Sequence, residues 1–162
     1  MKTFNTIARI LTLAFAATTA MWVLSYTSLL FAGPSSGEVL FVLAGLSLAY
    51  AGTVNTKHGG SSVQSIWIGG ISAFLNLMLL GSLVGGHSAG DILASGSTWF
   101  VILLGGSILL SLAGASIGKA LLPSIKFVDW RYRFFCVASL LVFLMLVTGG
   151  LVTGMEAGLA VP

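Results

Sequence analysis

Long apolar runs separated by short polar segments dominate the pattern of this chain. A helix needs about 20 apolar residues to cross the hydrocarbon core of a bilayer, and in lipid a helix satisfies all of its backbone groups internally. The pattern therefore predicts an all-α fold, a polytopic transmembrane bundle of about five spans. The predicted spans cover about residues 7–32, 39–54, 66–84, 99–117 and 134–153.

Turn-forming and charged segments divide these runs. The stretch 33–37, which reads Gly-Pro-Ser-Ser-Gly, ends the first run because proline lacks an amide donor and glycine relaxes the backbone. Residues 55–64 and 87–98 are polar and glycine-rich, which predicts two loops. Residues 123–133 mix basic and aromatic side chains, as helix ends at the headgroups do. The prediction is a four-span region, 1–122, and an interfacial segment with the fifth span, 123–162.

The first run also resembles a secretory signal, because Lys2 and Arg9 precede apolar residues and the alanine-rich stretch 16–20 could be a cleavage site. The apolar stretch continues to Phe31, which is longer than a signal core. We therefore expect an uncleaved first span.

The composition fits a membrane protein. Hydrophobic residues make up 57% of the 162 residues and charged residues 7%, whereas a soluble domain is about one-quarter charged. The formal net charge is +3, but the basic residues are scattered singly and form no basic face, so no nucleic-acid partner is predicted. Cys136 is the only cysteine, which excludes an internal disulfide and a thiolate metal cage.

The basic residues also predict a direction for the chain. If the amino terminus is cytoplasmic and the carboxyl terminus outside, every lysine and arginine falls on the cytoplasmic side, and Glu38, Asp91 and Glu156 fall outside. This sorting predicts an integral protein of a bacterial inner membrane. The basic residues are Lys2, Arg9, Lys57, Lys119, Lys126, Arg131 and Arg133.

Small residues recur four positions apart in several spans, a spacing that lets helix backbones approach closely. Gly105-Gly106 and Gly149-Gly150 are candidate bends. The pairs are Gly45 with Ala49, Gly81 with Gly85, Gly114 with Gly118, and the series Gly150, Gly154 and Gly158.

Asn76 lies near the middle of the third span, where an unpaired amide is costly. We expect it to bond another helix, in preference to a bound ligand. A small oligomeric channel lined by Asn76 and the serine-rich fourth span is a further hypothesis. It is disfavoured because no charged residue falls at the centre of any span.

Residues that could carry chemistry are few. The chain has no phosphate loop, HExxH helix, nucleophile elbow or useful pair of acids, so no catalytic or metal-binding residue is predicted. Haem needs axial histidine or methionine. His58 and His87 fall on opposite sides of the membrane, which leaves His87 with Met155 as a weak candidate pair against the simpler interpretation of ordinary loop histidines.

Residues 149–162 read Gly-Gly-Leu-Val-Thr-Gly-Met-Glu-Ala-Gly-Leu-Ala-Val-Pro. This stretch resembles the signature at the end of the first core helix of the haem A synthase family, which combines a Gly-Leu-Val-Thr run with an Ala-Gly-Leu element and a proline. The matching positions are Gly149, Gly150, Leu151, Val152, Thr153, Gly158, Leu159 and Pro162.

The resemblance implies that the first four spans are an amino-terminal extension and the fifth is the first helix of an enzyme core. It also implies that the motif leaves the membrane on the outer side, which agrees with the charge sorting. The family continues past this proline with histidine-bearing helices, so no haem ligand can be carried over onto this sequence. Glu156 does not correspond to the family's catalytic carboxylate.

On this interpretation the chain is a fragment, one part of a split protein, or a relative that keeps the motif without the catalysis. It serves cytochrome oxidase maturation, and haem binds only with additional segments or partners. The alternative is a noncatalytic accessory subunit of a respiratory or photosynthetic complex. In both cases the expected partners are the lipid bilayer and other membrane segments, and the isolated chain is not expected to be an enzyme.

Overall fold

The computed structural model describes residues 2–32, 37–84, 89–121, 123, 125 and 128–159, and the regular structure within them is entirely α-helical. These residues form five helices. They are α1 (Lys2–Ala32), α2 (Gly37–Lys57), α3 (Ser62–Val84), α4 (Ala89–Leu121) and α5 (Trp130–Leu159).

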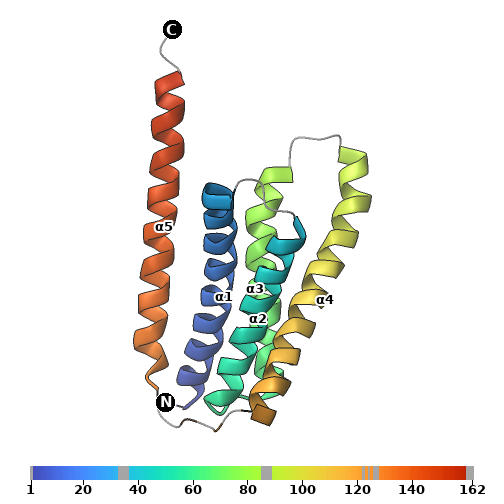
Figure 1. Ribbon diagram of the computed structural model, residues 1–162, viewed down its shortest axis with the longest axis vertical. Coiled ribbons are helices and arrows are strands. Elements are labelled where there is room, and N and C mark those ends of the chain that lie inside the picture. The colour runs from blue at the N-terminus through green and yellow to red at the C-terminus, as the bar shows by residue number, and fades with distance from the viewer. Residues whose placement is uncertain are drawn as a thin grey trace.

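Helices α1 to α4 pack side by side as a bundle, whereas α5 stands apart and touches only α1 among the helices of the described chain (Figure 1). The amino terminus of α1, the carboxyl ends of α2 and α4, and the first turns of α3 and α5 meet at one end of the molecule. We call this end the base.

The side chains are sorted in the sense opposite to that of a soluble protein. The interior holds small and polar residues such as Ala14, Ser72 and Ser111, whereas large apolar side chains such as Phe41 and Leu146 are 70% exposed. Three helices contain segments long and apolar enough to cross a membrane, and α3 contains a shorter apolar segment, Ser62–Met78. The three are Thr3–Ser25, Phe100–Leu121 and Trp130–Val147. The expected all-α, membrane-compatible bundle is therefore confirmed, while the count of five spans and their direction stay predictions.

The loop predicted at 55–64 contracts to residues 58–61 because both flanking helices are capped. At the end of α2, Gly59 has a φ of 75°, a left-handed conformation that favours glycine. At the start of α3, the amide of Ser61 donates to Gln64 Oε1 (3.1 Å) and the amide of Gln64 donates to Ser61 Oγ (3.4 Å). This reciprocal capping box starts α3 four residues before the predicted span.

The loop predicted at 87–98 is wrong over 89–98, because α4 already begins at Ala89; residues 87 and 88 lie outside the described chain. Glycine and serine suggested a loop there, but membrane helices tolerate both and no proline interrupts the stretch. Helix α5 begins at Trp130, where Asp129 Oδ1 accepts the amide of Arg131 (3.0 Å) as an amino-terminal cap.

Glycines allow α4 to lie directly against α2 and α3. A methyl group on Gly114 would overlap the carbonyl of Ala49, and one on Gly118 would overlap Thr56 Oγ1, so the close approach predicted for this pair is confirmed. Gly69 plays the same part between α3 and α4, because a methyl group added there would lie 2.6 Å from the Ser107 carbonyl oxygen; this close approach was not predicted. A methyl group on Gly45 would make only an ordinary contact, 3.5 Å from Leu110 Cδ1.

Candidate functional site

Asn76 lies in a polar seam between α1 and α3. Its Oδ1 accepts a hydrogen bond from Trp22 Nε1 (2.9 Å), and its Nδ2 lies 3.5 Å from Met21 Sδ. One turn away, the hydroxyls of Thr18 and Ser72 are 2.9 Å apart. The buried amide therefore bonds a neighbouring helix, as the sequence led us to expect.

The serines of α4 belong to different interfaces. Ser107 lies against Gly69 of α3, and Ser111 lies against Gly52 of α2. Ser111 is fully buried, and its Oγ has no hydrogen-bond partner within the described chain. Asn76, Ser107 and Ser111 thus contribute to different helix interfaces within the chain, and the channel formed by oligomerisation stays a hypothesis.

A second polar cluster lies at the base and centres on Arg9. Its guanidinium is buried and donates from Nη1 to the carbonyl of His58 (2.6 Å) and from Nη2 to Gln64 Oε1 (2.5 Å). Asn55 Nδ2 donates to the Ser61 carbonyl (3.1 Å) and to Ser65 Oγ (3.0 Å). These bonds fix the connection between α2 and α3 against the first turns of α1.

Trp130 attaches α5 to the same end of the molecule. Its side chain is 3% exposed, and its ring meets the His58 ring edge-on with centroids 5.2 Å apart. Its amide donates to Asn5 Oδ1 (3.3 Å). The amide of Ile125 donates to the Lys57 carbonyl (2.8 Å) and holds the preceding segment in place. We call Arg9, His58, Gln64 and Trp130 the basal cluster.

The basal cluster disfavours a charge on His58. Partial burial lowers the pKa of the imidazole below its usual value, and the nearby positive charge of Arg133 lowers it further. Lys57 and Arg9 act in the same direction, and only the backbone of Ile125 opposes them. His58 is therefore neutral at physiological pH, and it contributes packing where the sequence suggested no particular role.

Most of the basal cluster could not be identified from the sequence. Arg9 was interpreted only as a charge that sets topology, and Gln64 only as a loop residue. The available signal was an arginine set inside an apolar run, since such a charge needs polar partners from elsewhere in the chain.

The weak haem candidates lie outside the side chains that the structure describes, so their pairing stays a prediction. His87 lies outside the described residues, as does Pro162, and Met155 lies on α5 where only the backbone is described. The motif positions Gly149 to Leu159 form the last turns of α5. Within the described chain no group of three or more histidine, cysteine, aspartate or glutamate residues is placed to hold a metal ion.

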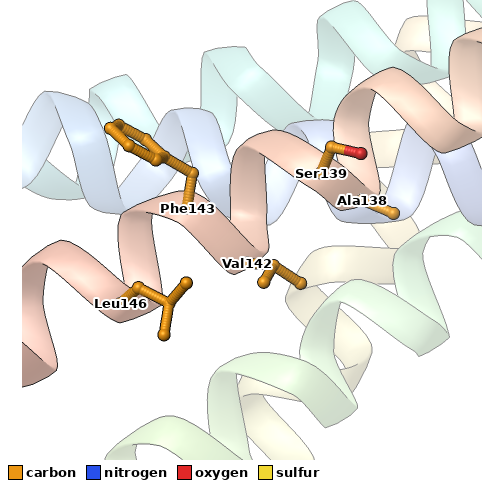
Figure 2. A pocket seen from close by; sticks show the side chains of 5 residues that line it. All are labelled: Ala138, Ser139, Val142, Phe143 and Leu146. Atoms are coloured by element: carbon orange, nitrogen blue, oxygen red, sulfur yellow. The ribbon is translucent and has the colours of Figure 1, made fainter.

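Helix α5 carries a shallow open groove of about 400 Å³ on its own surface. Figure 2 shows its side chains on successive turns of the helix, with no wall from the other helices. The lining residues are Ala138, Ser139, Val142, Phe143 and Leu146. The small residues Ala138 and Ser139 lie beside the larger Val142, Phe143 and Leu146 on this surface.

Comparison with known proteins adds no further assignment. No protein-family model, no curated protein and no solved structure matches the chain.

Proposed function

We propose that this chain is the membrane part of a haem A synthase-like protein that serves cytochrome oxidase maturation. Helices α1 to α4 anchor the protein, and α5 acts as the first helix of a haem-bearing core. The other core helices come from the same polypeptide or from a partner. The placement of α5 supports this division, because the helix that carries the motif lies outside the four-helix bundle and, among the described helices, contacts α1 alone.

The exposure of α5 provides the physical reason. In its segment Trp130–Val147 only 6% of the residues are buried, whereas 44% are buried in an 18-residue stretch of Thr3–Ser25 in α1. A lone helix in lipid gains little from the hydrophobic effect, so its association with further helices depends on close packing of small residues. The glycines of the motif, four residues apart, supply such a surface near the outer end of α5.

The proposed topology has five spans, a cytoplasmic amino terminus and an outer carboxyl terminus in a bacterial inner membrane. The gathering of Arg9, Lys57, Lys119, Arg131 and Arg133 at the base supports it, because the cytoplasmic side carries the excess of positive charge. Thiol labelling at engineered cysteines tests it. Lys57→Cys reacts only from the cytoplasmic side and Glu156→Cys only from the outside, in a Cys136→Ser background.

The functional proposal is tested by asking which membrane helices and which cofactor copurify with the chain. The whole chain, expressed from its own gene with any continuation, is purified in mild detergent in wild-type form and as Gly150→Leu/Gly154→Leu. We expect histidine-bearing membrane helices and haem absorbance to accompany the wild type, and both to fall at least several-fold in the double variant. The matched control is Gly105→Leu/Gly106→Leu, because both glycines of α4 face open space.

Retention of haem in the motif variant would contradict the proposal, as would unchanged haem A levels in cells lacking the gene.

The second candidate function is a noncatalytic subunit of a respiratory or photosynthetic complex, which the exposed α5 groove favours. A photo-crosslinker at Val142 would then capture a subunit of that complex without haem A synthase features. A chain that purifies as a lone monomer would count against this candidate.

A further inference from the structure

The base of the molecule carries far more positive than negative charge. The described side chains there include five cations and a single acid, Asp129. Arg9 is occupied by neutral partners, and Lys119 Nζ donates to the hydroxyl of Ser62 (2.8 Å). The positive charge is therefore not neutralised within the described chain.

Arg131 and Arg133 are held in place by aromatic rings. Both arginines are exposed, and the Arg131 guanidinium carbon lies 4.9 Å from the ring centre of Phe4 while that of Arg133 lies 5.4 Å from that of Trp130. A cation–π contact restrains a guanidinium without using its N–H donors as hydrogen bonds. Those donors form the fork that matches a phosphate group.

The residues around the two arginines indicate whether a phosphate bound there belongs to a lipid or to a soluble molecule. Beyond the two arginines, α5 turns apolar and exposed, with Phe135 and Leu146 exposed by 66% and 70%. Such side chains contact hydrocarbon in a membrane-spanning helix. Arg131 and Arg133 therefore lie at the depth where hydrocarbon gives way to lipid headgroups.

We propose that the base binds the phosphate groups of acidic phospholipids, with Arg131 and Arg133 as the principal ligands. Each arginine engages one headgroup, and the exposed ring of Phe4 beside Arg131 packs against the lipid, whereas the buried ring of Trp130 only restrains Arg133. This site rests on the membrane placement of α5 and is independent of the haem A synthase resemblance. Its consequence is a preference for anionic over zwitterionic lipid around α5.

The test measures lipids that remain bound to the full-length chain by native mass spectrometry. Phosphatidylglycerol is titrated against phosphatidylcholine for wild type, Arg131→Gln/Arg133→Gln and Lys57→Gln/Lys119→Gln. The two double variants have the same net charge. At about 1 kcal/mol for each basic residue, we expect the arginine variant to lose about 30-fold in preference for phosphatidylglycerol, and the lysine variant clearly less. Arg131→Lys/Arg133→Lys should fall between wild type and the glutamine variant.

Equal losses in the two double variants would overturn the assignment to Arg131 and Arg133, and a wild type without anionic preference would overturn the site itself. Sodium phosphate is the probe for a soluble anion, and full displacement of lipid by millimolar phosphate would overturn the lipid as its source. If a variant misfolds by circular dichroism, a salt series on the wild type decides. We expect the preference to fall as salt rises from about 0.05 to 0.5 M, and an unchanged preference would overturn the proposal.

Discussion

A buried guanidinium near the start of α1 connects three parts of the chain. Arg9 lies within an apolar helix, yet its two hydrogen bonds reach residues 49 and 55 positions away. Arg9 binds both the backbone carbonyl of His58 and the side-chain oxygen of Gln64. These two bonds fix the position of the connection between α2 and α3 relative to α1.

Replacing Arg9 with methionine should therefore destabilise the fold strongly. The change keeps an apolar chain of similar length but leaves the His58 carbonyl without its donor and removes one of the two donors to Gln64 Oε1, which still accepts the Ser61 amide. We expect a cost of about 1 to 3 kcal/mol of unfolding free energy. Gln64→Met keeps the bond from Arg9 to the His58 carbonyl but removes the bond from Arg9 and the capping bond from the Ser61 amide, so it should also cost about 1 to 3 kcal/mol. Unfolding by SDS in mixed micelles, followed by tryptophan fluorescence, measures both. An Arg9→Met protein as stable as wild type would contradict this account.

His58 should make the fold sensitive to acid. Burial and Arg133 lower its pKa in the folded chain, so the unfolded chain, with a pKa of about 6.5, binds a proton first as pH falls. Stability is therefore full above about pH 6.5 and declines as pH falls toward the lowered folded pKa, below which it no longer changes with this group.

The measurement is the thermal unfolding midpoint between about pH 7.5 and 5. His58→Gln should flatten the decline over this window. His87→Gln, which changes the other histidine of the chain, should leave it intact. A midpoint that rises on acidification, or a decline that persists in His58→Gln, would exclude His58 as the cause.

At the scale of the elements, glycine determines how closely α4 approaches its neighbours. Gly114→Ala should destabilise the chain by about 1 to 3 kcal/mol, because the added methyl overlaps the Ala49 carbonyl and the helices must separate. Gly105→Ala is the matched control on the same helix. A methyl there meets nothing within 4 Å, so the variant should gain up to about 1 kcal/mol from helix propensity. The same SDS titration measures both variants, and equal effects would contradict the packing role.

The sequence could predict the helices better than it could predict their contacts. Hydropathy identifies all five helical regions because a transmembrane helix is a local property of about 20 residues. The same signal failed at 89–98, where small residues resemble a loop but continue α4. Asn76 was correctly expected to bond another helix because a buried amide must, but its partner Trp22 lies 54 residues away and no local pattern indicates it.

At the scale of the whole molecule, the base unites the bundle and α5. The bond between Trp130 and Asn5 joins residues 125 positions apart, and it lies at the point where α5 starts to leave the bundle (Figure 1). Phe134 adds an edge-on contact with Phe15 of α1, at 6.3 Å between ring centres. These contacts attach the first turns of α5, and half-buried positions such as Leu141 and Leu144 recur further along the helix, while most of its other described side chains are exposed.

Removing Trp130 should release α5 while the four-helix bundle stays folded, because truncating a buried aromatic residue costs about 3 to 5 kcal/mol and Trp130 is the one buried residue among the described side chains of α5. Spin labels on the native Cys136, which is exposed, and on Ser116→Cys of α4 report the distance between α5 and the bundle. We expect one narrow distance distribution in wild type and a broad one in Trp130→Ala.

The control Trp67→Ala removes a 61% exposed tryptophan of α3 and should leave the distribution narrow. A second label pair within the bundle, at positions 63 and 109 in a Cys136→Ser background, should not change in either variant. A narrow α5 distribution in Trp130→Ala would show that contacts further along α1 hold the helix instead.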